Sequence, residues 1–289
     1  MDALQIVGVH GIRQGAGATT AGLSFSWQTT VNRVLVTVPP EAPRVAVTVP
    51  SYQAVFPRTP TRFIRLGAPE ADSFSQDRPI GEEEEAFILE ALAAYAPSAL
   101  EDMSPEAGMT LGESSLTPRI VSMAQAVDQK TGKGVTNRFL WLVREAYTYL
   151  RHEPTADAVR SEVARVLAHT GARMVIAHSL GSVVAYDLLN RGEAPGVTTL
   201  VTCGSPLSWL VGRKGLHPEG EPLTVPAGVE WTNLYALKDF VTGCAGLSGL
   251  ATGIADIEVN TGGFPSSHDV HRYLGTSAVA SLIVKNSAA

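Results

Sequence analysis

The sequence has little cysteine, no excess of basic charge and no long apolar run. Cys203 and Cys244 are the two cysteines among 289 residues, and they predict free thiols rather than a disulfide framework or a thiolate metal site. With 22 basic against 28 acidic residues the net charge is −6, which provides no positive field for nucleic acid or anionic lipid. No apolar stretch approaches membrane-spanning length, and Met1 is not followed by a basic and then apolar leader. We therefore expect a cytoplasmic protein that binds no nucleic acid and has no membrane span.

Hydrophobic residues make up 45% of the chain, which is enough for one full core, so we expect a single domain over residues 1–289. Short apolar runs alternate with segments of helical periodicity, and this alternation predicts an α/β fold. The expected sheet is mostly parallel and doubly wound, with helices on both faces. The predicted strands are 4–9, 45–49, 174–177, 197–203, 231–237 and 257–259.

Two core helices are predicted, over residues 24–35 with Ser24 or Ser26 as the cap and from Thr155 as cap to Gly171. Between the predicted strands at 45–49 and 174–177, the stretch from about 50 to 170 is much longer than an ordinary strand-to-helix connection. Helices are expected in it near 82–95, 120–129 and 137–151, the first with a solvated acidic start at Glu82–Glu85. Because so long an excursion is usually functional, we expect a helical lid or cap inserted at 50–170.

The most informative motif is Ala177-His178-Ser179-Leu180-Gly181. It follows a short β-branched apolar run and precedes residues with helical spacing, so it predicts a nucleophile elbow, a strained turn that exposes a serine hydroxyl. Small residues are needed two positions before and after the serine. Gly181 meets this requirement, whereas Ala177 departs from the usual glycine by one methyl group.

A nucleophilic serine needs a histidine to accept its proton and a carboxylate to orient that histidine. His268 lies in a loop after the last predicted strand, where such a base belongs, and His271 in the following helix is the alternative. Asp239 follows another predicted strand and should emerge at the same edge of the sheet as Ser179. Asp256 should lie at the opposite end of its strand, and the side chain of His178 should point away from the serine into packing.

The oxyanion that forms during acyl transfer needs preplaced donors. The backbone N–H of Leu180 is one candidate because it directly follows the nucleophile. The second is the N–H of Ile12, in the turn that His10 and Gly11 begin after the first strand.

Two further features resemble parts of other functional sites, but each lacks the full pattern. The glycines at 11, 15 and 17 lack the Lys-Ser/Thr ending of a P-loop and the third glycine of a dinucleotide fingerprint, so they do not predict a nucleotide site. Ser205, in Gly204-Ser205-Pro206, lacks small flanking residues and is predicted to lie in a turn.

With these residues in place, the chain resembles the α/β-hydrolase superfamily, and particularly its lipase-like and GPI-inositol-deacylase-like branch. The matching pieces are Val9-His10-Gly11, the elbow at 177–181, Cys203-Gly204-Ser205-Pro206-Leu207, Asn233-Leu234-Tyr235 before Asp239, and His268 before Tyr273-Leu274. The resemblance implies attack on an acyl carbonyl by Ser179, an acyl-enzyme intermediate, and no metal or organic cofactor. It leaves the substrate open, since one fold hosts many chemistries.

The leading expectation is a serine hydrolase that cleaves a carboxylic ester of a small or medium hydrophobic molecule with the triad Ser179, Asp239 and His268. A second interpretation is a thioesterase or acyltransferase that acts on a biosynthetic intermediate. A third, from a different class, is a binding protein on a hydrolase scaffold, which the complete set of triad and oxyanion residues disfavours.

Overall fold

The computed structural model describes residues 3–11, 18–37, 43–56, 80–95, 117–131, 135–210, 216–218, 220–264 and 266–287. The chain divides into two compact units. The larger comprises Met1–Phe56 together with Leu150–Ala289, and the smaller comprises Pro57–Tyr149.

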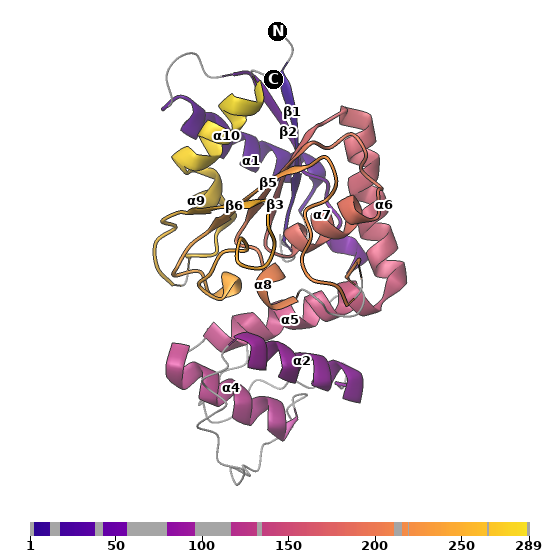
Figure 1. Cartoon of the computed structure of the whole chain (residues 1–289), viewed down its shortest axis with the longest axis vertical. Coiled ribbons are helices and arrows are strands. Elements are labelled where there is room, and N and C mark those ends of the chain that lie inside the picture. The colour runs from indigo at the N-terminus through magenta and orange to yellow at the C-terminus, as the bar shows by residue number, and fades with distance from the viewer. Residues whose placement is uncertain are drawn as a thin grey trace. The chain divides into compact units, whose positions relative to one another are not determined.

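The larger unit is built on one sheet of six strands in the order β2-β1-β3-β4-β5-β6, and every neighbouring pair is parallel (Figure 1). The central strands β3 and β4 are buried along their whole length, as expected for a parallel sheet covered on both faces. The predicted α/β class is confirmed. The strands are β1 (Leu4–Val9), β2 (Val45–Thr48), β3 (Met174–His178), β4 (Thr199–Cys203), β5 (Glu230–Tyr235) and β6 (Ile254–Glu258).

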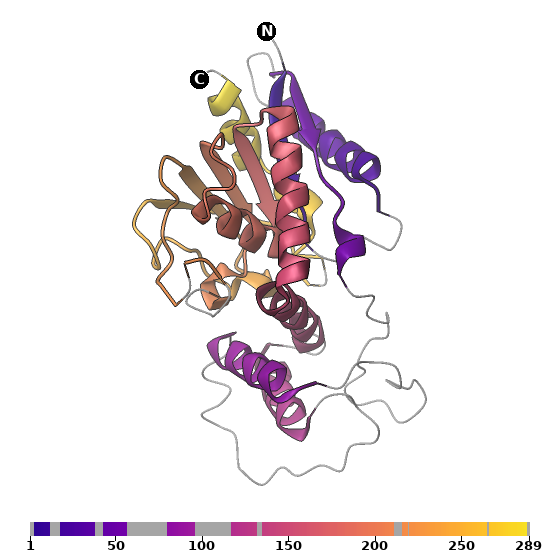
Figure 2. The same ribbon diagram turned by 90° about the vertical axis from the view of Figure 1, so that its right-hand side faces the viewer.

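Helices cover both faces of this sheet (Figures 1 and 2). On one face, α1 (Thr20–Leu35) contacts α9 (Val270–Leu274) and α10 (Ser277–Ser287). On the other, α6 (Glu153–Thr170) and α7 (Leu180–Asn190) contact each other and β1. Because successive strand residues point to opposite faces, β1 and β3 contribute alternate side chains to two cores. The core on the α1 side includes Ile6, Trp27, Val31, Val47, Met174, Ile176, Val201, Leu234, Tyr273 and Ile283.

The strand order changes direction next to β1, because β2 lies on one side of it and β3 on the other. In open parallel sheets, ligands bind outside the carboxyl ends of the strands at such a switch point. The residues that follow β1 and β3 are therefore the ones that the topology places at a potential site. Short helices at this edge of the sheet are η1 (Gln53–Val55), α8 (Leu207–Leu210) and η2 (Phe240–Thr242).

The two predicted helix caps are wrong. Helix α1 begins at Thr20, and the side chain of Thr19 caps it by accepting a hydrogen bond from the N–H of Gly22. The hydroxyl of Ser24 accepts instead from the N–H of Val49 beside β2. Helix α6 begins at Glu153, so Thr155 is inside its first turn, whereas the predicted end at Gly171 is confirmed by a left-handed residue there (φ 63°).

The smaller unit contains α2 (Glu82–Tyr95) and α4 (Pro118–Thr131), which contact each other, and most of α5 (Val135–Arg151), close to the predicted helices. Glu84 is buried and its carboxylate pairs with Arg144 at 2.8 Å, so the acidic start of α2 is only partly solvated, contrary to expectation. The insertion predicted at 50–170 is wider than this unit, because α6 belongs to the larger unit and packs on β1. In the described part of the chain, no helix has the length and apolar character needed to cross a membrane.

Candidate active site

Ser179 occupies the single-residue turn between β3 and α7, with a backbone φ of 55° and ψ of −132°. A non-glycine residue in this region costs on the order of 1–3 kcal/mol, so neighbouring contacts must hold it there. The N–H of Ser179 donates to the carbonyl of Cys203 at 3.0 Å, and the N–H and hydroxyl of Ser182 donate to the Ser179 carbonyl at 2.9 and 2.6 Å. The predicted elbow therefore has the strained geometry that the motif requires.

The elbow is packed tightly against the end of β1. A Cβ on Gly181 would lie 2.1 Å from the carbonyl oxygen of Val9, and a Cβ on Gly11 would lie 2.7 Å from the Cβ of Ser179. Both positions therefore require glycine. Ala177 is fully buried at the end of β3, so the fold accommodates its additional methyl group.

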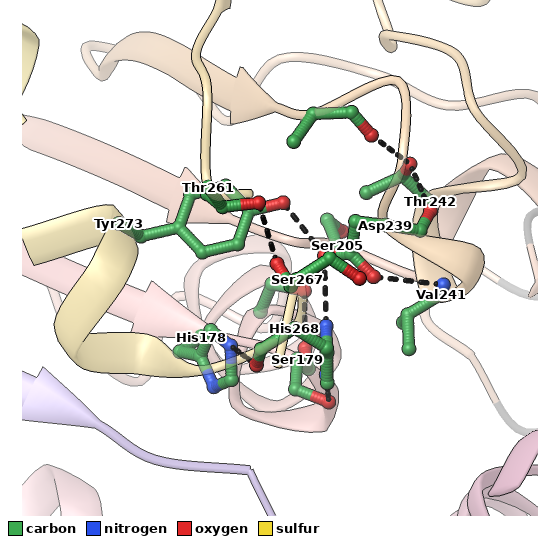
Figure 3. A network of polar contacts seen from close by, with 12 residues as sticks. His178, Ser179, Ser205, Asp239, Val241, Thr242, Thr261, Ser267, His268 and Tyr273 are labelled. Carbon is green, nitrogen blue, oxygen red and sulfur yellow. Dashed lines mark hydrogen bonds and ion pairs between the residues drawn. The ribbon is translucent and has the colours of Figure 1, made fainter. Parts of the chain in front are cut away.

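The three side chains predicted to form a triad lie in one chain of hydrogen bonds (Figure 3). The Nε2 atom of His268 lies 2.8 Å from the Oγ of Ser179, and its Nδ1 lies 2.8 Å from the Oδ2 of Asp239. We assign the imidazole proton to Nδ1, since a carboxylate can only accept there. These residues follow β3, β5 and β6, so the carboxyl edge of the parallel sheet brings them together.

The carboxylate of Asp239 is fully buried and accepts several hydrogen bonds. Its Oδ1 accepts from the N–H of Val241 at 2.9 Å, within η2. Its Oδ2 accepts from Nδ1 of His268 and, at 2.6 Å, from the hydroxyl of Tyr273 in α9. These donors offset the cost of burying the charge.

Gly204, the first residue after β4, leaves the space in which Asp239 and His268 meet. It has a φ of 58°, and a Cβ on it would lie 2.9 Å from the Oδ2 of Asp239 and 3.1 Å from the ring of His268. The turn predicted at Ser205 did not reveal that the neighbouring Gly204 contacts Asp239 and His268. The signal available was a glycine directly after a predicted central strand.

His178 packs into the interior as predicted, but it also contacts the base. Its Nε2–H donates to the backbone carbonyl of His268 at 3.0 Å, and the two ring centroids are 4.6 Å apart. Burial lowers the pKa of His178 well below its ordinary value, so the ring is neutral at neutral pH. It therefore supports the backbone of His268 without adding charge beside it.

Ser205 is buried next to the elbow and stabilises it through hydrogen bonds. Its hydroxyl donates to the Oγ of Ser182 at 2.7 Å, because the one hydroxyl proton of Ser182 goes to the Ser179 carbonyl, and its oxygen accepts from the N–H of Leu207 at 3.2 Å. Because Ser182 in turn holds the Ser179 carbonyl, this second serine stabilises the nucleophile's turn. The expectation of a turn residue is compatible with these contacts.

His271 lies away from Ser179. Its two ring nitrogens contact the hydroxyls of Ser26 at 3.1 Å and Thr30 at 2.9 Å, both on α1. It therefore joins α9 to α1, and the structure brings His268 rather than His271 to the serine.

Asp256 lies in the middle of β6, so its expected place at a strand end is wrong. Its Oδ1 accepts from the side chain of Asn233 at 2.8 Å and from the N–H of Leu247 at 3.0 Å. The carboxylate thereby holds the loop after η2 against the sheet.

His10 supports the turn after β1. Its ring is fully buried and stacks on Tyr52 with centroids 4.0 Å apart, and its Nδ1–H donates to the carbonyl of Gly11. The Tyr52 hydroxyl donates to the carbonyl of His10. Burial lowers the pKa of His10 to about 4, so the ring is neutral at neutral pH.

Of the two predicted oxyanion donors, Leu180 is the first residue of α7, where the N–H has no acceptor within the helix. The other, Ile12, lies outside the described residues. Within the described ranges, no group of three or more histidine, cysteine or acidic side chains is arranged to hold a metal ion, and both cysteines are free.

Comparison with models of protein families, with curated proteins and with solved structures finds no match for this chain. The function of the site therefore has to be inferred from its own geometry.

Proposed function

We propose that this protein is a serine hydrolase of the α/β-hydrolase type that cleaves a carboxylic ester of a small or medium hydrophobic substrate. The observation that carries the proposal is the pair of 2.8 Å contacts that joins Ser179, His268 and Asp239 on a strained turn at the switch point of the sheet. A chance cluster of these three groups would not require the strained φ of 55° at the serine.

The arrangement supports the usual course of acyl transfer. As Oγ of Ser179 attacks the carbonyl carbon, its proton passes to Nε2 of His268, while Asp239 holds Nδ1–H and stabilises the imidazolium. The tetrahedral intermediate then breaks its bond to the alcohol oxygen, which takes the proton from Nε2. Water repeats the sequence on the acyl-serine, and this step releases the carboxylic acid and restores the hydroxyl.

The negative oxygen of each tetrahedral intermediate needs donors that are already aimed at it. The N–H of Leu180 supports this role, because it lies at the positive end of α7 and next to the nucleophile. We propose the N–H of Ile12 as its partner, since Gly11 before it is packed directly against Ser179.

Apolar side chains near the base favour a hydrophobic substrate. The ring of Phe240 lies 5.7 Å from that of His268, and Phe264 packs edge-on against Phe240 at 6.5 Å. Phe264 is 46% exposed and Leu237 is 52% exposed, so apolar surface is available at the ends of β5 and β6. From the length of the inserted segment alone, we propose its part outside the larger unit, 57–149, as a lid.

A fluorophosphonate probe tests the proposal because it reacts with an activated serine and not with an ordinary one. We expect an adduct on Ser179 of the folded protein, located by peptide mass spectrometry, and none in Ser179→Ala. Turnover of p-nitrophenyl esters of increasing acyl length, compared with thioesters and peptides, identifies the substrate class. The proposal is wrong if the wild type forms no adduct or if Ser179→Ala is labelled equally.

A further inference from the structure

Tyr273 places a buried hydroxyl on the acid of the triad. The residue lies in α9 and is fully buried, and its hydroxyl donates to Oδ2 of Asp239 at 2.6 Å (Figure 3). This is the same oxygen that accepts from Nδ1 of His268 at 2.8 Å. Burial and the nearby charge of Asp239 raise the pKa of Tyr273 far above its ordinary value, so the phenol is always a donor here.

We propose that Tyr273 is a positioning residue that sets the basicity of His268 through Asp239. The inference rests on the proposed hydrolase function, because it assigns a role in the same triad. A carboxylate stabilises the imidazolium that forms when Ser179 loses its proton. A second donor on the same oxygen takes up part of that negative charge, so the imidazole holds its proton less tightly. The base is then neutral, and able to act, at lower pH.

The other titratable groups around the pair do not provide this effect. His178, which touches His268, is neutral because burial lowers its pKa, and the charges of His10 and His271 act on His178 in the same direction. The thiols of Cys203 and Cys244 have raised pKa values, the latter partly through the charge of Asp239, so both are uncharged at neutral pH. Asp269 is exposed and caps α9 through the N–H of His271.

The position of Tyr273 in the fold also aligns the base. His268 precedes α9 and Tyr273 lies within it, so one short segment carries both donors to Oδ2 of Asp239. The hydroxyl therefore fixes the rotamer of Asp239 relative to the same segment that presents the imidazole. Loss of the hydroxyl leaves Oδ2 held by Nδ1 of His268 alone.

The variant Tyr273→Phe removes the hydroxyl and keeps the ring. We expect the acid limb of the kcat/KM profile to move to higher pH by about half a unit to one unit, since a hydrogen bond to a charged group is lost. The titration midpoint of the His268 ring, followed by NMR, should move by the same amount. Tyr186→Phe is the matched control, because it removes a hydroxyl that contacts Thr224 instead of the triad, and both measurements should stay at the wild-type position.

Site-specific 3,5-difluorotyrosine at position 273 tests the opposite sign and does not depend on whether Tyr273→Phe folds. Its more acidic phenol is a stronger donor, so the acid limb and the NMR midpoint should move to lower pH. Unchanged midpoints, or a shift in the same direction for both changes, would overturn the inference. The NMR measurement needs no substrate, so an NMR shift in a protein that hydrolyses no ester supports the role of Tyr273 and counts against the proposed function alone.

Discussion

Each residue of the proposed triad is held by a hydrogen bond that would take no part in proton transfer. The N–H of Ser179 donates to Cys203, the Oδ1 of Asp239 accepts from Val241, and the carbonyl of His268 accepts from His178. Such contacts matter because a misplacement of reacting groups by about 1 Å can cost on the order of a hundredfold in rate. At the scale of single residues, the site therefore depends on groups that never touch a substrate.

The assignment of the base predicts unequal effects for two histidines close in the sequence. His268→Ala removes the group proposed to accept the serine proton, and we expect turnover of an activated ester to fall by at least about a thousandfold. His271→Ala removes contacts with Ser26 and Thr30 on α1, and most of the activity should remain. Steady-state kinetics on purified, folded variants measures both. Equal losses, or a larger loss for His271→Ala, would contradict the assignment.

At the scale of elements, the site is formed where the ends of three strands converge too closely for a Cβ. Gly11 follows β1, Gly181 is the second residue of α7 after β3, and Gly204 follows β4. Gly11 faces Ser179, Gly181 faces the backbone at the end of β1, and Gly204 faces Asp239 and His268. The close approach of these elements, more than the flexibility of the turns, explains why glycine is needed at all three positions.

The contact of Gly204 predicts that Gly204→Ala reduces activity more than its backbone strain alone would. The methyl group would lie 2.9 Å from Oδ2 of Asp239 and must displace the carboxylate or the His268 ring. Gly171→Ala is the control, because Gly171 also has a positive φ, of 63°, and a Cβ there meets nothing within 4 Å.

Both variants should lose about 1–2 kcal/mol of stability from the left-handed backbone. We expect only Gly204→Ala to lose kcat as well, by at least about tenfold, which corresponds to about 1.4 kcal/mol in the transition state. Thermal unfolding and ester kinetics separate the two effects. An active Gly204→Ala with a normal kcat would show that the acid and base tolerate the added methyl group.

At the scale of the whole molecule, the larger unit buries two histidines as neutral rings at the carboxyl edge of its sheet. His10 packs on Tyr52, and His178 packs on His268. Burial lowers the pKa of both, that of His10 to about 4. Since the unfolded chain binds these protons near the ordinary value of about 6.5, folding becomes less favourable as the pH falls below it.

We therefore expect the free energy of unfolding to decrease between pH 6.5 and about 4, the window that the shifted pKa of His10 defines. At pH 5 the titration of His10 should have lowered the free energy of unfolding by about 2 kcal/mol. His10→Asn keeps a donor toward Gly11 but no longer titrates, so its loss of stability from pH 7.5 to pH 5 should be smaller by about that amount. Urea unfolding at the two pH values measures the difference.

The same experiment on His169→Gln controls for the loss of a histidine as such, because His169 is exposed in the last turn of α6. It should keep the wild-type pH dependence. An equal dependence in His10→Asn and the wild type would show that His10 does not titrate in the expected window.

Local patterns were sufficient to predict much of the fold. The run over residues 4–9 matches β1 (Leu4–Val9), and the run at 174–177 matches β3 apart from His178, because alternation and β-branched residues are properties of the strand itself. The cap of α1 was missed for a tertiary reason. Ser24 is a good local cap, but its hydroxyl accepts a hydrogen bond from the N–H of Val49, directly after β2. Thr19 caps the helix instead.

The candidate site also combines features that are local in the sequence with features that depend on the fold. The local sequence was enough to predict the turn at Ser179 and the small residues around it, because both depend on neighbours within a few positions of the chain. The candidate acid and base were identified by their places after predicted strands. Tertiary contacts were needed to show that His268 rather than His271 meets the serine, that Gly204 borders Asp239, and that the hydroxyl of Tyr273 reaches the same carboxylate. Hydrogen bonds of 2.6–2.8 Å between residues 29 to 89 positions apart depend on the order and register of parallel strands, which long-range packing sets.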